Sequence, residues 1–231
     1  MNRISNYIIC ATARSGSNLL CDLLASLVFA GKPFEHLWDP PGSTSQPLAV
    51  RWPCILEEGR GDNGVFGTKL LWYQAERLER ELPAALGQPD RSLIDVLAEA
   101  IGNPRYIYLK RRDHVRQAVS FARAIQTEQW RSMDRVASQP QYDAGAISAA
   151  IHALEQEEAN WEAFFTRADI RPHRLTYEDL DSAPREAIGD LMRFLGYQGL
   201  LPNSLASSRH QRQADDVTEN WVRRYEKEEH P

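Results

Sequence analysis

The chain has 231 residues, of which 42% are hydrophobic and 26% charged, a balance typical of a globular protein with a substantial core. Its 27 basic and 32 acidic residues give a net charge of -5, which argues against a general nucleic-acid binder. The apolar run at residues 7–13 is too short for an export signal or a membrane span. We therefore expect one domain over residues 1–231, located in the cytoplasm, with no nucleic-acid partner and no membrane span.

The cysteines and histidines indicate neither disulfides nor a metal site. Cys10, Cys21 and Cys54 form no CxxC pair, and the six histidines lack metal-ligand spacing. An odd number of cysteines without a paired pattern fits a reducing compartment. We therefore expect no disulfide framework and no bound metal.

Short apolar runs and amphipathic patterns alternate along the chain. Residues 7–12 predict a strand buried on both faces, and leucines from Leu19 to Leu27 then recur at helical spacing. Further strands are predicted at 65–71, 105–110 and 174–177, and further helices near 74–86, 92–101, 113–130, 144–168 and 184–195. Strands that alternate with helices predict an α/β fold with a mainly parallel sheet.

Two segments show no sustained period. Residues 32–63 are dense in Pro, Gly and Ser, and we expect them to form a long irregular segment, of the kind that commonly carries function. The chain ends in a polar tail that includes Trp221 and Tyr225. In the helix predicted at 144–168, Glu158 interrupts the apolar stripe.

The turn between the first strand and the first helix is a candidate anion site. It comprises Arg14, Ser15, Gly16, Ser17 and Asn18. Backbone N–H groups and the helix dipole attract anions at such a junction, and the side chains add donors. The alternative is an ordinary strand-to-helix turn capped by Ser17.

The third predicted strand ends in cationic residues. A nucleoside-triphosphate P-loop requires the pattern GxxxxGK[ST], but no lysine follows Gly16. The strand ends in Lys110, Arg111 and Arg112, which fit an additional phosphate and offer Mg²⁺ no ligand. These features favour an anionic nucleotide bound without a metal.

A serine two helical turns further on extends this basic cluster. Ser120 lies eight residues after Arg112, about 10 Å along the helix axis, close to the same face. Arg111 or Arg112 is therefore predicted to bind one phosphate together with Ser120. The alternative is a solvated basic helix start followed by a surface serine.

Five motifs occur in an order that resembles a known family. They are Arg14-Ser15-Gly16-Ser17, Gly31-Lys32-Pro33-Phe34-Glu35, Gly67-Thr68-Lys69-Leu70-Leu71-Trp72, Arg112-Asp113 with Gln117-Ala118-Val119-Ser120, and Arg212-Gln213-Ala214-Asp215 with Trp221 and Arg224-Tyr225. Over nearly its whole length the chain resembles the trehalose 2-sulfotransferase family of bacterial enzymes that use 3'-phosphoadenosine-5'-phosphosulfate (PAPS). The resemblance implies a P-loop-like three-layer sandwich and a tendency to form homodimers.

The resemblance also implies roles for individual residues. The loop at 14–18 would hold the 5'-phosphosulfate, and Arg111 or Arg112 with Ser120 would hold the 3'-phosphate. Beside these roles, the charge of Lys69 predicts that it helps to hold the phosphosulfate and stabilises the transferring group, the alternative being a surface lysine near a strand end. Glu35 would be the general base that deprotonates an acceptor hydroxyl. The product nucleotide would be 3'-phosphoadenosine-5'-phosphate (PAP), formed without a covalent enzyme intermediate.

In the family the irregular segment after the base contacts a sugar. The corresponding residues here are Phe34, His36, Leu37, Pro47 and Trp52. Trp52 is predicted either to stack on a pyranose ring or to pack in the core. The family usually has Gln where this chain has Ala13 and Thr where it has Asn18. Since the resemblance implies that this Gln binds the disaccharide, the acceptor stays open.

Two other functions remain as alternatives. One is an ATP-dependent, P-loop-like small-molecule kinase, which the missing lysine and strand-end carboxylate disfavour. The other is a catalytically silent nucleotide-binding paralogue, which the differences at Ala13 and Asn18 favour. The leading hypothesis is a PAPS-dependent sulfotransferase acting on a sugar-like acceptor.

Overall fold

A sheet of parallel strands forms the centre of the molecule. The structure is a computed structural model that describes residues 4–39, 46–130, 138–203, 205 and 216–229. Within these residues the sheet has the order β2-β1-β3-β4, every pairing being parallel. Its strands are β1 (Tyr7–Ala11), β2 (Gly67–Leu71), β3 (Arg105–Lys110) and β4 (His173–Thr176). Their carboxyl ends therefore meet at one edge, where α/β proteins commonly bind ligands.

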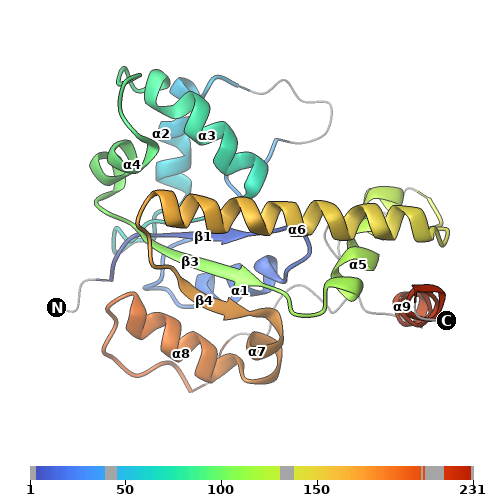
Figure 1. The fold of residues 1–231 in the computed structure, drawn as a ribbon. Coiled ribbons are helices and arrows are strands. Elements are labelled where there is room, and N and C mark those ends of the chain that lie inside the picture. The colour runs from blue at the N-terminus through green and yellow to red at the C-terminus, as the bar shows by residue number, and fades with distance from the viewer. Residues whose placement is uncertain (1–3, 40–45, 131–137, 204, 206–215, 230–231) are drawn as a thin grey trace.

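Helices cover both faces of this sheet (Figure 1). Helices α2, α3, α4 and α6 lie on one side, and α1, α7 and α8 lie on the other. The described helices are α1 (Ser17–Ala25), α2 (Leu48–Glu58), α3 (Trp72–Ala85), α4 (Leu93–Ile101), α5 (His114–Thr127), α6 (Ala144–Arg167), α7 (Tyr177–Ser182), α8 (Pro184–Phe194) and α9 (Asp216–Glu229). The prediction of an α/β three-layer fold with a mainly parallel sheet is confirmed.

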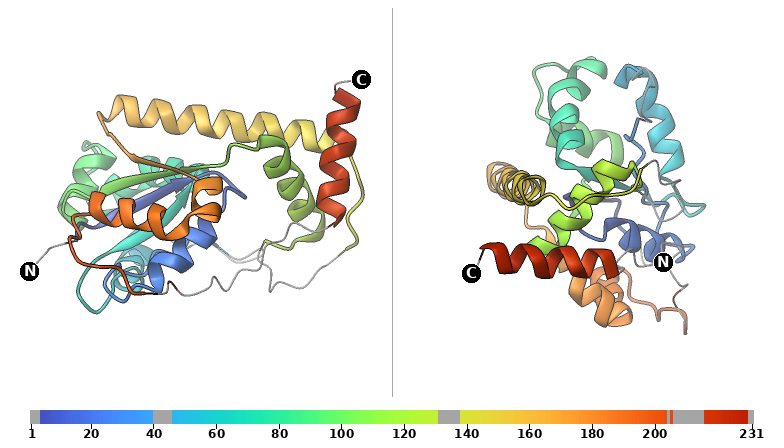
Figure 2. Two further views of the ribbon diagram at one scale, coloured as in Figure 1. Left: turned by 90° about the horizontal axis from the view of Figure 1, so that it is seen from below. Right: turned by 90° about the vertical axis from the view of Figure 1, so that its right-hand side faces the viewer.

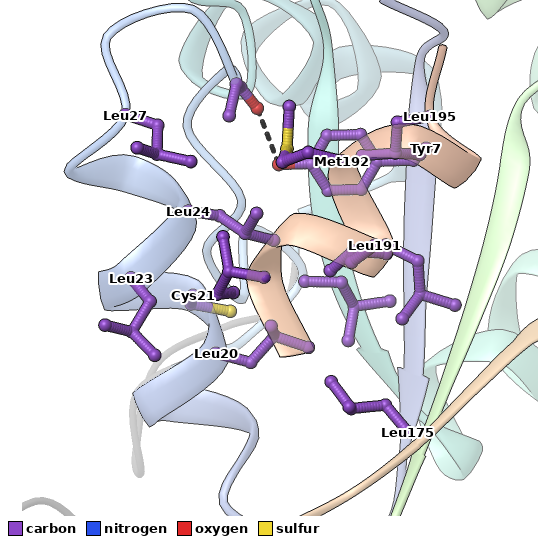
Figure 3. Close-up of a cluster of buried hydrophobic side chains, with 14 of the residues drawn as sticks. Tyr7, Leu20, Cys21, Leu23, Leu24, Leu27, Leu175, Leu191, Met192 and Leu195 are labelled. Carbon is purple, nitrogen blue, oxygen red and sulfur yellow. Dashed lines mark hydrogen bonds between the residues drawn. The ribbon is translucent and has the colours of Figure 1, made fainter. Parts of the chain in front are cut away.

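The central strand β1 contributes to two hydrophobic cores. Tyr7 and Ile9 pack with α1 and α8, whereas Ile8 and Cys10 pack with α2, α3, α4 and α6. This alternation explains the continuous apolar run, since a strand covered on both faces has no solvent-facing side. The Tyr7 hydroxyl donates a hydrogen bond of 2.6 Å to the buried backbone oxygen of Ala30 (Figure 3).

The segment expected to be irregular contains a helix. Helix α2 occupies Leu48–Glu58, and Leu48, Trp52 and Ile55 form its buried stripe. The expectation of an irregular segment rested on the density of Pro, Gly and Ser in residues 32–63 and was wrong for these eleven residues. Pro53 lies inside the helix. Proline usually ends a helix by removing a backbone donor, but the buried stripe holds this helix in place.

The expected polar tail also forms a helix. In α9, Trp221, Val222 and Tyr225 are buried against α5 and α6 in a third hydrophobic cluster. Figure 2 shows α9 at one end of the molecule, beside α5. None of the described helices has the length and apolar character needed to cross a membrane.

Candidate active site

The loop between β1 and α1 adopts a tight left-handed turn. Arg14 has a φ of 60° and Gly16 a φ of 86°. This conformation strains a non-glycine residue but suits glycine. The turn brings the first backbone N–H groups of α1 to the carboxyl edge of the sheet. Such N–H groups have no acceptor within their helix, so the turn has the geometry that favours an anion; anion binding itself stays a prediction.

Buried side chains brace this loop from inside. Ser15 Oγ donates to the backbone oxygen of Thr12 at 2.8 Å. Gln117 of α5 donates to the backbone oxygen of Ala13 at 2.7 Å and to Thr12 Oγ1 at 2.9 Å. The Ser15 hydroxyl is therefore used within the loop, and Gln117 contributes to the site by fixing the shape of the loop.

Ser120 contacts the loop arginine in the described structure. Arg14 Nε donates to Ser120 Oγ at 2.9 Å, and Arg14 Nη1 donates to the backbone oxygen of Trp130 at 2.7 Å. The sequence interpretation joined Ser120 to Arg111 or Arg112 instead. The left-handed turn at Arg14 directs its side chain toward α5, and the sequence spacing does not reveal this.

The two strand-end arginines have different environments. Arg111 is largely buried: its guanidinium lies 4.6 Å from the centre of the Tyr177 ring, and Nη1 donates to the Arg14 backbone oxygen at 3.4 Å. Its buried Nε has no hydrogen-bond partner among the described residues, and burial lowers the pKa of Arg111. The Arg112 side chain is 60% exposed and pairs with Asp179 at 3.1 Å. Arg111 is therefore the arginine adjacent to residues 14–18, which are called the anion loop below.

Glu35 lies beside β2 with both carboxylate oxygens in contact with donors. Its Oε2 is 2.6 Å from Lys69 Nζ, and the two side chains are 13% and 4% exposed. Lys69 Nζ also donates to Asn18 Oδ1 at 2.8 Å. The other oxygen, Oε1, accepts two hydrogen bonds. Gln74 Nε2 donates one at 3.0 Å, and Tyr73 Oη donates the other at 3.4 Å. A chain of contacts thus runs from Glu35 through Lys69 to the anion loop.

Backbone pairing explains the position of Glu35. Phe34 forms an isolated parallel bridge with Thr68 of β2, and the Lys69 N–H donates to the Phe34 backbone oxygen at 3.0 Å. The chain before Glu35 therefore runs along the edge strand of the sheet. Sequence reasoning found Glu35 and Lys69 but missed Tyr73 and Gln74, which directly follow the motif that ends at Trp72.

The residues predicted to contact an acceptor separate into two groups. Phe34 is 43% exposed, and Pro47 is also exposed. Trp52 is 3% exposed, and Leu37 packs with it in the core between the sheet and α2. His36 is buried, with Nε2 2.8 Å from the Lys32 backbone oxygen. These three side chains face the interior, which favours the packing alternative for Trp52, while acceptor contacts by His36 and Leu37 stay predictions.

Asp39 connects the segment after Glu35 to two helices. Arg77 of α3 lies 3.0 Å from Asp39 Oδ2, and Arg51 of α2 lies 3.5 Å from Oδ1. Arg51 also donates to the His36 backbone oxygen at 2.5 Å. Arg51 and Arg77 thus hold the chain that follows Glu35 in place. Neither arginine was predicted from the sequence.

The contacts described above do not bear on two expectations, namely the role of the last motif and the absence of a bound metal. Residues 212–215 of the last motif lie outside the described part of the chain. Among the described residues, no group of three or more His, Cys, Asp or Glu side chains is arranged to hold a metal ion. Turnover without a metal therefore stays a prediction.

Comparisons with known proteins identify the class as sulfotransferase. The family model described as Stf0 sulphotransferase matches residues 6–46 and 39–228. The chain belongs to the Stf0 sulphotransferase family. The trehalose 2-sulfotransferase of Mycolicibacterium smegmatis is 31% identical, over 96% of this chain and 94% of that protein.

Two further proteins are similar to this chain. The trehalose 2-sulfotransferase of Mycobacterium tuberculosis is 32% identical over the same shares, 96% of this chain and 94% of that protein. Among solved structures, a sulfotransferase domain from the curacin biosynthetic pathway aligns with 98% of each chain at 18% identity and a TM-score of 0.47. The family model and the two trehalose 2-sulfotransferases confirm the predicted family resemblance.

Proposed function

We propose that this protein transfers a sulfuryl group from PAPS to a hydroxyl of a carbohydrate, by direct in-line attack, with Glu35 as general base. The observation that carries the proposal is the contact chain from Glu35 through Lys69 to Asn18. Lys69 contacts both the Glu35 carboxylate and Asn18 of the proposed anion-binding loop. Proton removal and stabilisation of a transferring anionic group need these three elements side by side.

The residues present fit the donor nucleotide. The left-handed turn at Gly16 and the amino end of α1 suit the 5'-phosphosulfate, with Lys69 beside them. Arg111 and Ser120 are assigned to the 3'-phosphate. The buried, unpartnered Nε of Arg111 supports this assignment because an anion would supply its missing acceptor. Arg14 donates to Ser120 Oγ, and its backbone oxygen accepts a hydrogen bond from Arg111, so Arg14 would link the two phosphate positions.

The proposed reaction needs no enzyme-bound intermediate. The acceptor oxygen forms a bond to sulfur while the bond from sulfur to the bridging phosphate oxygen breaks. PAP leaves with that electron pair, and Glu35 takes the hydroxyl proton. Lys69 stabilises negative charge on the sulfuryl oxygens and the leaving oxygen. The products are a sulfate ester and PAP.

A carbohydrate acceptor is supported by the relatives, both of which are trehalose 2-sulfotransferases. The exposed aromatic rings of Phe34, Trp38 and Tyr73 lie within four residues of Glu35 or in contact with it. Such rings offer apolar faces to a sugar. We propose a sugar acceptor without assigning trehalose, because the Ala13 side chain lacks the amide of the Gln that the family usually has at this position. Cytoplasmic location and homodimerisation remain predictions.

The test is sulfate transfer from PAPS to a panel of mono- and disaccharides, with and without a metal chelator. We expect turnover that resists chelation and falls at least 100-fold in Glu35→Gln. Glu58→Gln is the matched control, because Glu58 lies 3.4 Å from His36 in the same region but does not contact Lys69. In parallel, the melting temperature is measured with PAP, 5'-AMP or ATP–Mg²⁺. Selective stabilisation by PAP supports the donor site.

Other outcomes would overturn the proposal. Stabilisation by ATP–Mg²⁺ with phosphorylation of a sugar would establish the kinase alternative. Tight PAP binding without transfer to any hydroxyl would establish the silent paralogue. Full activity of Glu35→Gln would exclude Glu35 as the base.

A further inference from the structure

Gln74 is a fully buried amide whose two ends are both engaged. It lies in the first turn of α3 and is 1% exposed. Its Oε1 accepts the Leu71 N–H at 2.9 Å, where β2 passes into α3. Its Nε2 donates to Glu35 Oε1 at 3.0 Å and to Tyr73 Oη at 3.2 Å. The side chain therefore spans from the backbone to the proposed base.

These partners allow one orientation of the amide. The Leu71 N–H is a donor and requires the carbonyl oxygen of Gln74, while the Glu35 carboxylate requires the NH₂ group. The reversed orientation would place a carbonyl against a carboxylate and two N–H groups against each other. The backbone corner between β2 and α3 thus dictates that a donor faces Glu35.

The two oxygens of Glu35 consequently differ. Oε2 is paired with the ammonium of Lys69 at 2.6 Å, whereas Oε1 contacts only the neutral groups of Gln74 and Tyr73 among the described residues. A proton on either oxygen neutralises the carboxylate, but a proton on Oε2 would also displace the Lys69 ammonium from that oxygen. With the proton on Oε1, Oε2 can still accept a hydrogen bond from Lys69 Nζ. Oε1 is therefore the oxygen better placed to accept a proton, and Tyr73, which is half exposed, lies on its side of the carboxylate.

We propose that Gln74 is a positioning residue that holds Oε1 of Glu35 as the proton-accepting oxygen. The inference rests on the proposed role of Glu35 as general base. Gln74 acts through Glu35 and contacts neither the donor nor the sulfur. Its loss lets the carboxylate rotate about its last torsion angle, away from the acceptor hydroxyl. A misplacement of about 1 Å lowers turnover by about 10²-fold in well-aligned reactions.

Two variants test this role, one by replacing the donor that faces Glu35 and the other by removing the hydrogen bonds of Gln74. Gln74→Glu keeps an oxygen to accept the Leu71 N–H but replaces the donor at Glu35 by a second carboxylate. Neighbouring carboxylates cannot both ionise readily, so we expect the acidic limb of the pH profile of kcat to move up by at least one pH unit. Activity should recover as the pH rises. Gln74→Met removes all three side-chain hydrogen bonds at similar volume and should lower kcat about 10- to 100-fold.

Binding measurements separate positioning from folding. The KM for PAPS and the PAP-induced rise in melting temperature should stay near wild-type values in both variants, because the hydrogen bonds of Gln74 go to Leu71, Glu35 and Tyr73 and not to the residues proposed to bind the donor. Gln156→Glu is the matched control for added charge, since Gln156 is exposed on α6 and contacts only Asn160 among the described residues. This control should keep the wild-type pH profile and kcat.

The result that overturns the inference is clear in either variant. If Gln74→Glu keeps the wild-type acidic limb, or Gln74→Met keeps kcat within twofold while Glu35→Gln is inactive, Gln74 does not position the base. A parallel loss of kcat and of the PAP-induced stabilisation would assign Gln74 a merely structural role. Full activity of Glu35→Gln would instead refute the proposed base itself, which keeps the two failures distinct.

Discussion

The ring of Tyr177 occupies the space beside Gly16 where a side chain would otherwise lie. A Cβ atom on Gly16 would come within 2.4 Å of Tyr177 Cδ2. The same ring lies 4.6 Å from the guanidinium of Arg111. One aromatic side chain at the start of α7 therefore packs against both the anion loop and the arginine at the end of β3.

Gly16→Ala should weaken donor binding. The added methyl group would collide with Tyr177, displacing either the loop or the ring that supports Arg111, so we expect at least a tenfold rise in the dissociation constant of PAP by calorimetry. The matched control is Gly87→Ala, because Gly87 also has a positive φ, 73°, with no atom within 4 Å of an added Cβ. The control should cost about 1 kcal/mol of stability and leave PAP affinity unchanged. Equal affinities in the two variants would contradict the role of this packing.

Trp52→Ala should be a stability mutation. The indole is buried in the core between the sheet and α2, and truncation of a buried Trp costs about 3–5 kcal/mol. Phe34→Ala, at an exposed ring, should change the free energy of unfolding by only about 0.5 kcal/mol. Urea denaturation measures both. A Trp52→Ala protein of wild-type stability with a raised KM for the acceptor would restore the stacking role.

Glu157→Gln should stabilise the protein at high pH. Burial raises the pKa of Glu157 to about 7, and its Oε2 has no hydrogen-bond partner among the described residues. An unfolded glutamate titrates near about 4.3, so the folded protein binds more protons between that pH and about 7. The contribution of this residue to stability therefore falls as pH rises through that window.

Removing the carboxylate should raise the free energy of unfolding by about 1–2 kcal/mol at pH 8, allowing for solvent screening at this half-buried position. At pH 4 the change should vanish. Thermal denaturation at the two pH values measures the effect, with Glu155→Gln on the exposed face of α6 as control. A pH-independent difference would show that charge on Glu157 is not the cause.

Glu158→Gln should destabilise the junction of β3 and α5. Glu158 interrupts the apolar stripe of α6 because its Oε2 lies 2.5 Å from Lys110 Nζ and its Oε1 lies 3.4 Å from His114 Nε2. Loss of the charge leaves the partly buried Lys110 ammonium without its carboxylate, at a cost of about 1–3 kcal/mol. A double-mutant cycle with Lys110→Met isolates the pair. Additive effects in that cycle would mean that the two side chains do not stabilise each other.

Sequence patterns were informative wherever burial dictates local structure. Residues 7–12 and 105–110 were predicted as strands because both faces of β1 and β3 are covered. The helix predicted at 113–130 corresponds to α5, where the Asp113 side chain caps the helix by accepting the Arg116 N–H. Helix α2 was missed because residues 32–63 are dense in Pro, Gly and Ser, which hid the short buried stripe of Leu48, Trp52 and Ile55.

Contacts between distant segments were less accessible from the sequence. The Glu35 side chain meets Gln74 across 39 positions, and Arg14 meets Ser120 across 106. The first pair depends on the backbone bridge beside β2, and the second depends on the left-handed turn at Arg14. Neither feature leaves a periodic signal. Long-range pairing of this kind is set by tertiary packing, which a local pattern does not report.

Helix α3 begins at Trp72, directly after β2 ends at Leu71, with no loop between them. Lys69 and Gln74, the partners of the two Glu35 oxygens, therefore belong to one strand–helix corner, whereas residues 37–63 supply neither of them. Substitutions at exposed positions of that stretch replace neither partner. Divergence of acceptor preference among descendants of such a protein can accordingly proceed by exposed substitutions in one segment, while the Glu35 carboxylate keeps its neighbours.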